Sequence, residues 1–240
     1  FFAIFLLIAF TASVVSGVAA VFLEIVAYRR LRNMGASRLS SLISAIGASF
    51  FLTEVARILT GSKNLDFPRM LDKNTIFQFS TAYVTADKLL VLGGAALIFY
   101  ILNRIINHTK LGLGIRAVSQ DERTSVLMGV NVNRVISYTF LLGGVLAGLG
   151  SAFYMVFYET TKSNVGFLVG ISAFTAAVLG GIGNVRGALV GSFVLGLFQQ
   201  YTAAVLGYNW RDVVTFVVLV FVLLVKPTGL LGEALQKARV

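Results

Sequence analysis

Cysteine is absent from this sequence, and histidine and charged residues are scarce. Without Cys, the chain cannot form disulfides, thiolate metal sites or a cysteine nucleophile. His108 is the single histidine, so we expect no metal site and no histidine proton relay. Charged residues make up 12% of the chain and hydrophobic residues 57%, whereas a soluble domain is about 25% charged. This composition excludes a soluble enzyme and a disordered chain, and it predicts a membrane protein.

The apolar residues are gathered into blocks that are long enough to cross a bilayer, which takes about 20 residues as a helix. The blocks are continuous and do not alternate with polar residues, which is typical of helices and not of a membrane barrel. We therefore predict an all-α membrane protein, a polytopic bundle of about seven spans, as one transmembrane domain over residues 1–240. The predicted spans are residues 1–27, 39–60, 86–106, 135–157, 165–179, 188–206 and 208–225.

The basic residues lie mainly in the gaps between these blocks and are distributed unequally. Thirteen Lys and Arg residues fall on one side of the predicted membrane and six on the other. The positive-inside rule places the richer side in the cytoplasm, so we expect a cytoplasmic C-terminus. The residues behind the net charge of +10 thus lie in the gaps between apolar blocks, and we expect no nucleic-acid partner. Because the chain opens on Phe1 within an apolar block, we expect a further N-terminal region with additional spans.

Glycine is frequent, with 24 residues, and several glycines have helical spacing. Pairs four residues apart let helix backbones approach closely in lipid. We predict packing within the chain for these pairs, with a dimer face as the alternative. The pairs are Gly144 with Gly148, Gly166 with Gly170, and Gly187 with Gly191.

The fifth predicted span, residues 165–179, is short and is followed by Gly180, Gly181 and Gly183. A short segment rich in glycine is typical of a discontinuous helix beside a substrate path. A tight turn between two packed helices is an equally good interpretation, and both stay open at this point.

Charged side chains inside spans are costly, so each is a candidate for function. Glu54 and Arg57 are three residues apart near the outer end of a span, and they can pair on one helix face. Their side chains can reach the membrane surface or line the outer mouth of a path. Glu24 lies near Arg29 at the inner edge of the first span, where we predict a local ion pair.

Residues 108–134 form the most informative gap, which we term the cytoplasmic loop. Ser119 and Glu122 have the spacing of a capping box, which predicts a helix over residues 120–128. Gly129 follows where a left-handed residue ends a helix. We expect Val126, Leu127 and Val130 to pack back on the membrane domain. A helix of about nine residues is marginal alone, so we predict that a protein partner holds it, with lipid headgroups as the alternative.

The sequence of this loop resembles the cytoplasmic signature of branched-chain amino acid ABC transporter permeases. The resemblance rests on residues 114–121 (GIRAVSQD) and 127–132 (LMGVNV), and it continues in residues 24–32, 142–148, 177–184 (AVLGGIGN) and 226–232 (KPTGLLG). It covers nearly the whole chain. Three features depart from the family: a stretch Asn-Phe-Ala-His-Gly is absent, Arg30 stands where Pro is usual, and residues 61–79 are divergent.

The resemblance implies a multi-pass permease subunit of the bacterial inner membrane that imports leucine, isoleucine or valine. It implies a second permease subunit, two cytoplasmic ATPases that bind ATP and Mg²⁺, and a periplasmic or lipid-tethered substrate-binding protein. This chain itself would be no enzyme, and it carries no phosphate-binding loop with Gly-Lys-Ser/Thr. Carried over by motif, the residues that couple to the ATPase are Arg116, Ser119, Gln120, Asp121, Glu122, Arg123, Met128 and Gly129.

The sequence defines the substrate less sharply than it defines the type of transporter. Asn164, Ser172 and Thr175 can offer polar groups to the charged ends of an amino acid, and Glu54 and Arg57 complete the candidate path. A permease of the same family for urea, amides or a sugar, a passive channel and an inactive scaffold subunit remain the alternatives.

Overall fold

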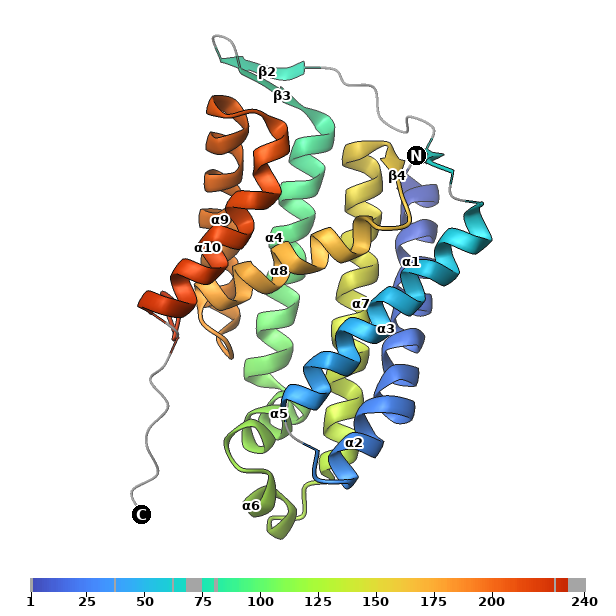
Figure 1. Cartoon of the computed structure of the whole chain (residues 1–240), viewed down its shortest axis with the longest axis vertical. Coiled ribbons are helices and arrows are strands. Elements are labelled where there is room, and N and C mark those ends of the chain that lie inside the picture. Colours follow the sequence, from blue (N-terminus) through green and yellow to red (C-terminus); the bar gives the residue numbers. More distant parts are fainter. Residues whose placement is uncertain are drawn as a thin grey trace. The chain divides into compact units, whose positions relative to one another are not determined.

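The computed structural model describes residues 2–36, 38–61, 63–67, 75–79, 82–226 and 228–232, and these are mainly helical (Figure 1). Six helices in these ranges are long and apolar enough to cross a membrane, and Val165–Gly180 is a shorter apolar helix of 16 residues. The predicted all-α polytopic fold is confirmed. The basic residues Arg69, Lys73, Lys237 and Arg239, used above for the orientation, lie outside the described residues.

The chain divides into two compact units, Phe1–Ser163 and Asn164–Val240. The helices of the first unit are α1 (Phe2–Leu23), the π-helical segment η1 (Glu24–Tyr28), α2 (Arg29–Asn33), α3 (Arg38–Thr60), α4 (Ala86–His108), α5 (Lys110–Gln120), α6 (Glu122–Leu127) and α7 (Val132–Tyr158). Its strands β1 (Leu65–Asp66) and β4 (Thr160–Thr161) pair antiparallel, as do β2 (Thr75–Phe79) and β3 (Ala82–Thr85).

The first unit is centred on the contact between α1 and α7, which lie side by side in Figure 1. A Cβ atom on Gly144 would lie 2.7 Å from the Ser16 carbonyl oxygen, and one on Gly148 would lie 2.5 Å from that of Ala12. Such close backbone approach is the use that membrane helices make of small residues. Packing within the chain is therefore confirmed for this glycine pair.

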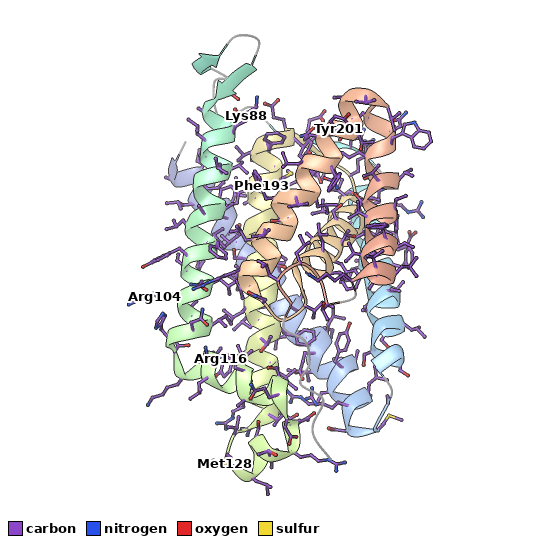
Figure 2. The ribbon with its side chains drawn as sticks, turned by 90° about the vertical axis from the view of Figure 1, so that its left-hand side faces the viewer. Lys88, Arg104, Arg116, Met128, Phe193 and Tyr201 are labelled. Carbon is purple, nitrogen blue, oxygen red and sulfur yellow. The ribbon has the colours of Figure 1, made fainter. Side chains whose placement is uncertain are left out.

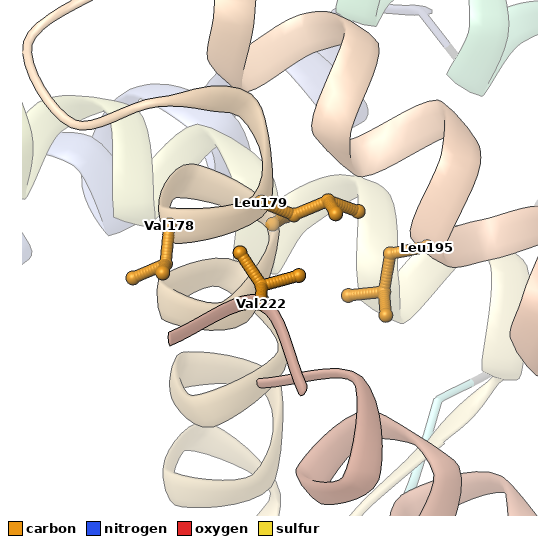
Figure 3. Close-up of a cluster of buried hydrophobic side chains, with 5 residues drawn as sticks. Val178, Leu179, Leu195 and Val222 are labelled. Carbon is orange, nitrogen blue, oxygen red and sulfur yellow. The ribbon is translucent and has the colours of Figure 1, made fainter. Parts of the chain in front are cut away.

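The second unit consists of α8 (Val165–Gly180), α9 (Val185–Val205), the short η2 (Tyr208–Trp210) and α10 (Arg211–Val225). Its buried core is shown in Figure 3 and contains Ala176, Val178, Leu179, Leu195 and Val222.

Glycines bring α8 and α9 into backbone contact in this unit. A Cβ atom on Gly191 would lie 2.2 Å from the Ala176 carbonyl oxygen, and one on Gly187 would lie 2.5 Å from that of Gly180. Packing within the chain is confirmed for this second pair. Among the described residues of this unit, no atom lies within 4 Å of a Cβ built on Gly166 or Gly170, so packing within the chain stays a prediction for that third pair.

Helix α8 is continuous, and its glycine-rich end is a tight turn into α9. Gly181 and Gly183 have φ angles of 112° and 94°, which a residue with a side chain rarely adopts. The Asn184 side chain then caps α9 by accepting from the Gly187 amide at 3.2 Å. Of the two interpretations of this segment, the turn is therefore the one observed, and the discontinuous span is not found.

Candidate functional site

The cytoplasmic loop contains two helices, although the sequence predicted one. Thr109 starts α5, because its side-chain oxygen accepts a hydrogen bond from the Gly112 amide at 3.1 Å. A Cβ atom on Gly112 would lie 2.1 Å from the Ile106 carbonyl oxygen, so glycine allows the sharp corner between α4 and α5. Arg116 reaches back across this corner and donates to Asn107 Oδ1 at 3.2 Å.

The predicted capping box at Ser119 is wrong. Ser119 and Gln120 belong to the last turn of α5, and the Ser119 hydroxyl donates to the Arg116 carbonyl oxygen at 2.8 Å. The backbone turns at Asp121, so the second helix starts at Glu122 and ends at Leu127. Capping by Asp121 wins because its carboxylate is a stronger acceptor than a hydroxyl and stands directly before the helix.

Asp121 caps α6 with both carboxylate oxygens. Oδ1 accepts from the Arg123 amide at 2.9 Å, and Oδ2 accepts from the Thr124 hydroxyl. These hydrogen bonds, led by that from the Thr124 side chain, hold the pKa of the Asp121 carboxyl below its usual value. The carboxylate is therefore ionised at neutral pH and sits at the positive end of the helix.

Gly129 ends α6 as predicted, with a φ angle of 83°. The Val130 amide donates to the Ser125 carbonyl oxygen, and the Gly129 amide donates to that of Val126, each at 3.0 Å. This pair of bonds is a Schellman motif, which satisfies carbonyl groups that a helix end would leave exposed. Both ends of α6 are thus capped by hydrogen bonds within the chain, which stabilise a helix of only six residues.

The outer surface of this loop is apolar. Val126, Leu127 and Met128 expose 57%, 85% and 80% of their surface, and Figure 2 shows Met128 at the far end of the loop, beyond Arg116. The prediction that Val126 and Leu127 pack back on the membrane domain is therefore wrong, because Ser125 occupies the buried side of α6. Adjacent exposed apolar side chains outside the predicted spans are candidates for contact with another protein. We term residues 126–128 the loop tip.

The base of the loop is fastened to α1 and α2 by charged groups. Glu24 in η1 is fully buried, and its carboxylate pairs with Arg29 at 3.0 Å and with Arg32 at 3.4 Å. This confirms the predicted local ion pair. Two contacts extend it to α7: Arg29 donates to Ser137 Oγ at 2.8 Å, and Arg32 donates to Asn133 Oδ1 at 2.6 Å.

No sequence pattern indicated the contacts to α7, since they join residues more than 100 positions apart. A π-helical turn such as η1 often marks a functional site in a helix. Here it is the segment that places the Glu24 carboxylate beside both arginines.

The candidate path residues fall into separate groups. Glu54 and Arg57 form the predicted ion pair on α3, with about half of each side chain exposed. In the second unit, Asn164 is exposed before α8, while Ser172 faces a small cleft that Asp212 and Phe216 also line.

Thr175 is fully buried, and its hydroxyl donates to the Ile171 carbonyl oxygen at 2.9 Å. It therefore has a structural partner within its own helix. The sequence analysis missed a buried polar pair of the second unit: Gln199 Nε2 donates to Thr215 Oγ1 at 2.7 Å, and both residues are buried. A glutamine inside an apolar block is the signal that could have indicated it.

None of these arrangements has the geometry of a reaction centre. Across the described ranges, no three His, Asp or Glu side chains gather as ligands of a metal ion. What the described residues offer is a set of apolar spans with polar groups within them and, between α5 and α7, a capped helix whose end exposes the apolar residues 126–128.

Comparisons with known proteins agree with this architecture. Residues 1–223 match the family model for the branched-chain amino acid transport system permease component. The chain is 38% identical over 232 residues to the high-affinity branched-chain amino acid transport system permease protein BraD of Pseudomonas aeruginosa, covering 95% of this chain and 75% of that protein. It is 36% identical over 214 residues to the corresponding protein LivH of Escherichia coli, covering 88% and 69%. No solved structure matches significantly.

Proposed function

The chain belongs to the family of branched-chain amino acid transport permeases, and from this premise we propose that it is a permease subunit of a bacterial ABC importer. In this proposal it forms the membrane path together with a second permease subunit. Two cytoplasmic ATPases bind ATP and Mg²⁺ and drive the cycle, while this chain catalyses no reaction. A periplasmic or lipid-tethered binding protein delivers leucine, isoleucine or valine.

The proposed location is the bacterial inner membrane, with the cytoplasmic loop and the C-terminus inside. The unequal distribution of Lys and Arg supports this orientation. Four apolar helices, α7 to α10, separate the cytoplasmic loop from the C-terminus, and an even number of crossings would place the loop and the C-terminus on the same side of the membrane.

The loop tip is the observation on which the coupling role depends. Val126, Leu127 and Met128 are exposed on a helix whose two ends are fixed. A rigid element can pass a displacement from one protein to another, whereas a flexible loop absorbs it. Movement of an ATPase that holds this tip would reach α5 and α7 directly, because these helices flank α6 in the chain.

In this proposal, polar and charged residues around the loop tip orient it on the ATPase. Arg123, Glu122 and Gln120 are exposed beside the apolar residues, as in interfaces that combine an apolar centre with a polar rim. Asp121, Ser119, Arg116 and Gly129 act by holding the backbone of the loop in shape.

The substrate path is proposed to use polar groups in an otherwise apolar bundle. An aliphatic amino acid needs apolar contacts for its side chain and hydrogen-bonding groups for its charged ends. Asn164, Ser172, Thr175, Glu54 and Arg57 remain the candidates. Of these, Ser172 lines a small cleft together with Asp212.

Reconstitution tests this function directly. The permease pair, the ATPases and the binding protein would be placed in liposomes, and uptake of labelled leucine, isoleucine, valine, urea and fructose would be measured with and without ATP. The proposal expects uptake of the three amino acids only, and only with ATP. Uptake without ATP would identify a passive channel, and uptake of urea or fructose would identify another cargo.

A further inference from the structure

A polar cavity of about 450 Å³ lies beside the buried ion pairs of the first unit. Its volume is in the range of small-molecule sites. It is lined by Arg29, Asn131, Asn133, Arg134, Ser137 and Tyr138. The lining contains two guanidinium groups, two amides and two hydroxyl groups, and it contains no carboxylate.

The charges around this cavity do not cancel. Glu24 is fully buried and is shared by Arg29 and Arg32, so one negative charge faces two positive ones. Arg134 adds a further positive charge, and its side chain makes no ion pair within the described part of the chain. A cavity with this excess of positive charge and many donors attracts an anion, and arginine binds phosphate groups particularly well.

The position of the cavity along the spanning helices indicates which anion would bind there. Arg29 and Ser137 belong to the ends of the spanning helices Ala3–Asn33 and Val132–Tyr158, whereas the loop tip lies further along the chain in α6. Tyr138, which is half exposed, has the amphipathic ring that membrane proteins place at headgroup level. Basic pockets between spanning helices on the cytoplasmic side are the sites where anionic headgroups bind.

We propose that this cavity binds the phosphate of an anionic phospholipid headgroup from the cytoplasmic leaflet, through Arg134 and Arg29. The bound phosphate would neutralise the excess charge and join α2 to the start of α7, next to the cytoplasmic loop. From the proposed function this inference takes only the orientation of the chain.

Native mass spectrometry of the purified, delipidated transporter complex tests the proposal. Phosphatidylglycerol and phosphatidylethanolamine with identical acyl chains would be titrated, with inorganic phosphate as a separate competitor. We expect phosphatidylglycerol to bind preferentially. Arg134→Gln is expected to weaken its binding about tenfold, as expected for loss of a charged hydrogen bond. Arg104→Gln serves as the matched control, because Arg104 is exposed on α4 and does not line the cavity.

Each other outcome overturns the inference in a distinct way. Equal weakening by Arg104→Gln would mean that only general surface charge attracts the lipid. Displacement of phosphatidylglycerol by an equal concentration of inorganic phosphate would assign the site to free phosphate. Binding that is present in the permease pair and absent once the ATPases are added would assign it to an acidic group of the ATPase. None of these results depends on transport, so failure of the proposed function would be seen separately.

Discussion

Two turns of the first unit have the same backbone and different surfaces. In the first turn, residues 30–36, the Ala36 amide donates to Leu31 and the Gly35 amide to Arg32; in the second turn, residues 124–130, Val130 and Gly129 bond in the same pattern. Met34 and Met128 precede the glycines and are exposed by 82% and 80%.

The neighbours of the two methionines differ. The first turn ends the helix α2, which contains three arginines, and two of these pair with Glu24. The second turn continues the exposed apolar surface of Val126 and Leu127. The shared backbone is a way to stop a helix, and the side chains decide what the turn does. The first turn is held by its own chain, and in the proposed function the second offers a surface to a partner.

Removing the anchor of the first turn should have the largest effect. Glu24→Ala leaves Arg29 and Arg32 without their carboxylate, and we expect a loss of about 2–3 kcal/mol in the free energy of unfolding, since both arginines are partly exposed. Thermal unfolding of the purified full chain, followed by circular dichroism, measures it. Glu54→Ala breaks an exposed pair and should cost less than about 1 kcal/mol. Equal losses would contradict the anchoring role.

Changing the surface of the second turn should impair transport and leave stability unchanged. Met128→Asp places a charge in the proposed apolar contact, and we expect ATP-driven leucine uptake to fall about tenfold or more, as for loss of an interface anchor. Uptake by reconstituted complexes measures this. Met34→Asp introduces the same charge at an equally exposed methionine. Its uptake should stay within about twofold of the uptake by the unaltered protein. If both variants transport equally well, the distinction between the turns is lost.

The shared backbone predicts equal costs for the same glycine change. Gly35→Ala and Gly129→Ala each place a side chain at a φ angle near +70° or +80°, which costs about 1 kcal/mol. Among the residues that the structure describes, neither site has an atom within 4 Å of the added Cβ, so no steric clash distinguishes them. Thermal unfolding of the two variants should therefore give matching losses. A much larger loss at one position would mean that the two turns are not equivalent.

Acidification should loosen the second turn slightly. The folded pKa of Asp121 is lowered, so its stabilising effect is complete above the usual aspartate pKa and is lost as pH falls through the folded pKa. The variant Asp121→Asn keeps a capping oxygen that does not titrate. As the pH falls through the folded pKa of Asp121, hydrogen exchange of the α6 amides should become about twofold faster in the unaltered protein than in this variant. An unchanged ratio across this pH range would exclude Asp121 as the cap.

The spans and the left-handed glycine could be predicted from the sequence, because both depend on local properties. Apolar blocks of bilayer length show the spans, and Gly129 follows a helical stretch where a stop is needed. The starting residue of α6 was misplaced because Ser119 and Asp121 both have capping side chains, and the backbone angle that decides between them is not visible in the sequence.

The remaining features depend on contacts between distant segments. The bonds from Arg29 to Ser137 and from Arg32 to Asn133 require α1 and α7 to be packed together first. The exposure of Leu127 depends equally on which face of α6 the rest of the chain covers, and Ser125 is on that covered face. Hydrophobic residues are usually expected inside, so an apolar contact surface is misread without a structure.

Site-specific cross-linking tests the central claim most directly, and the absence of native cysteine makes it possible in this chain. Leu127→Cys and Met34→Cys would each be introduced into the assembled complex and treated with a short thiol-to-amine cross-linker. The account predicts a product with the ATPase subunit from Leu127→Cys and none from Met34→Cys. No ATPase product from Leu127→Cys in a complex that still transports leucine would contradict it.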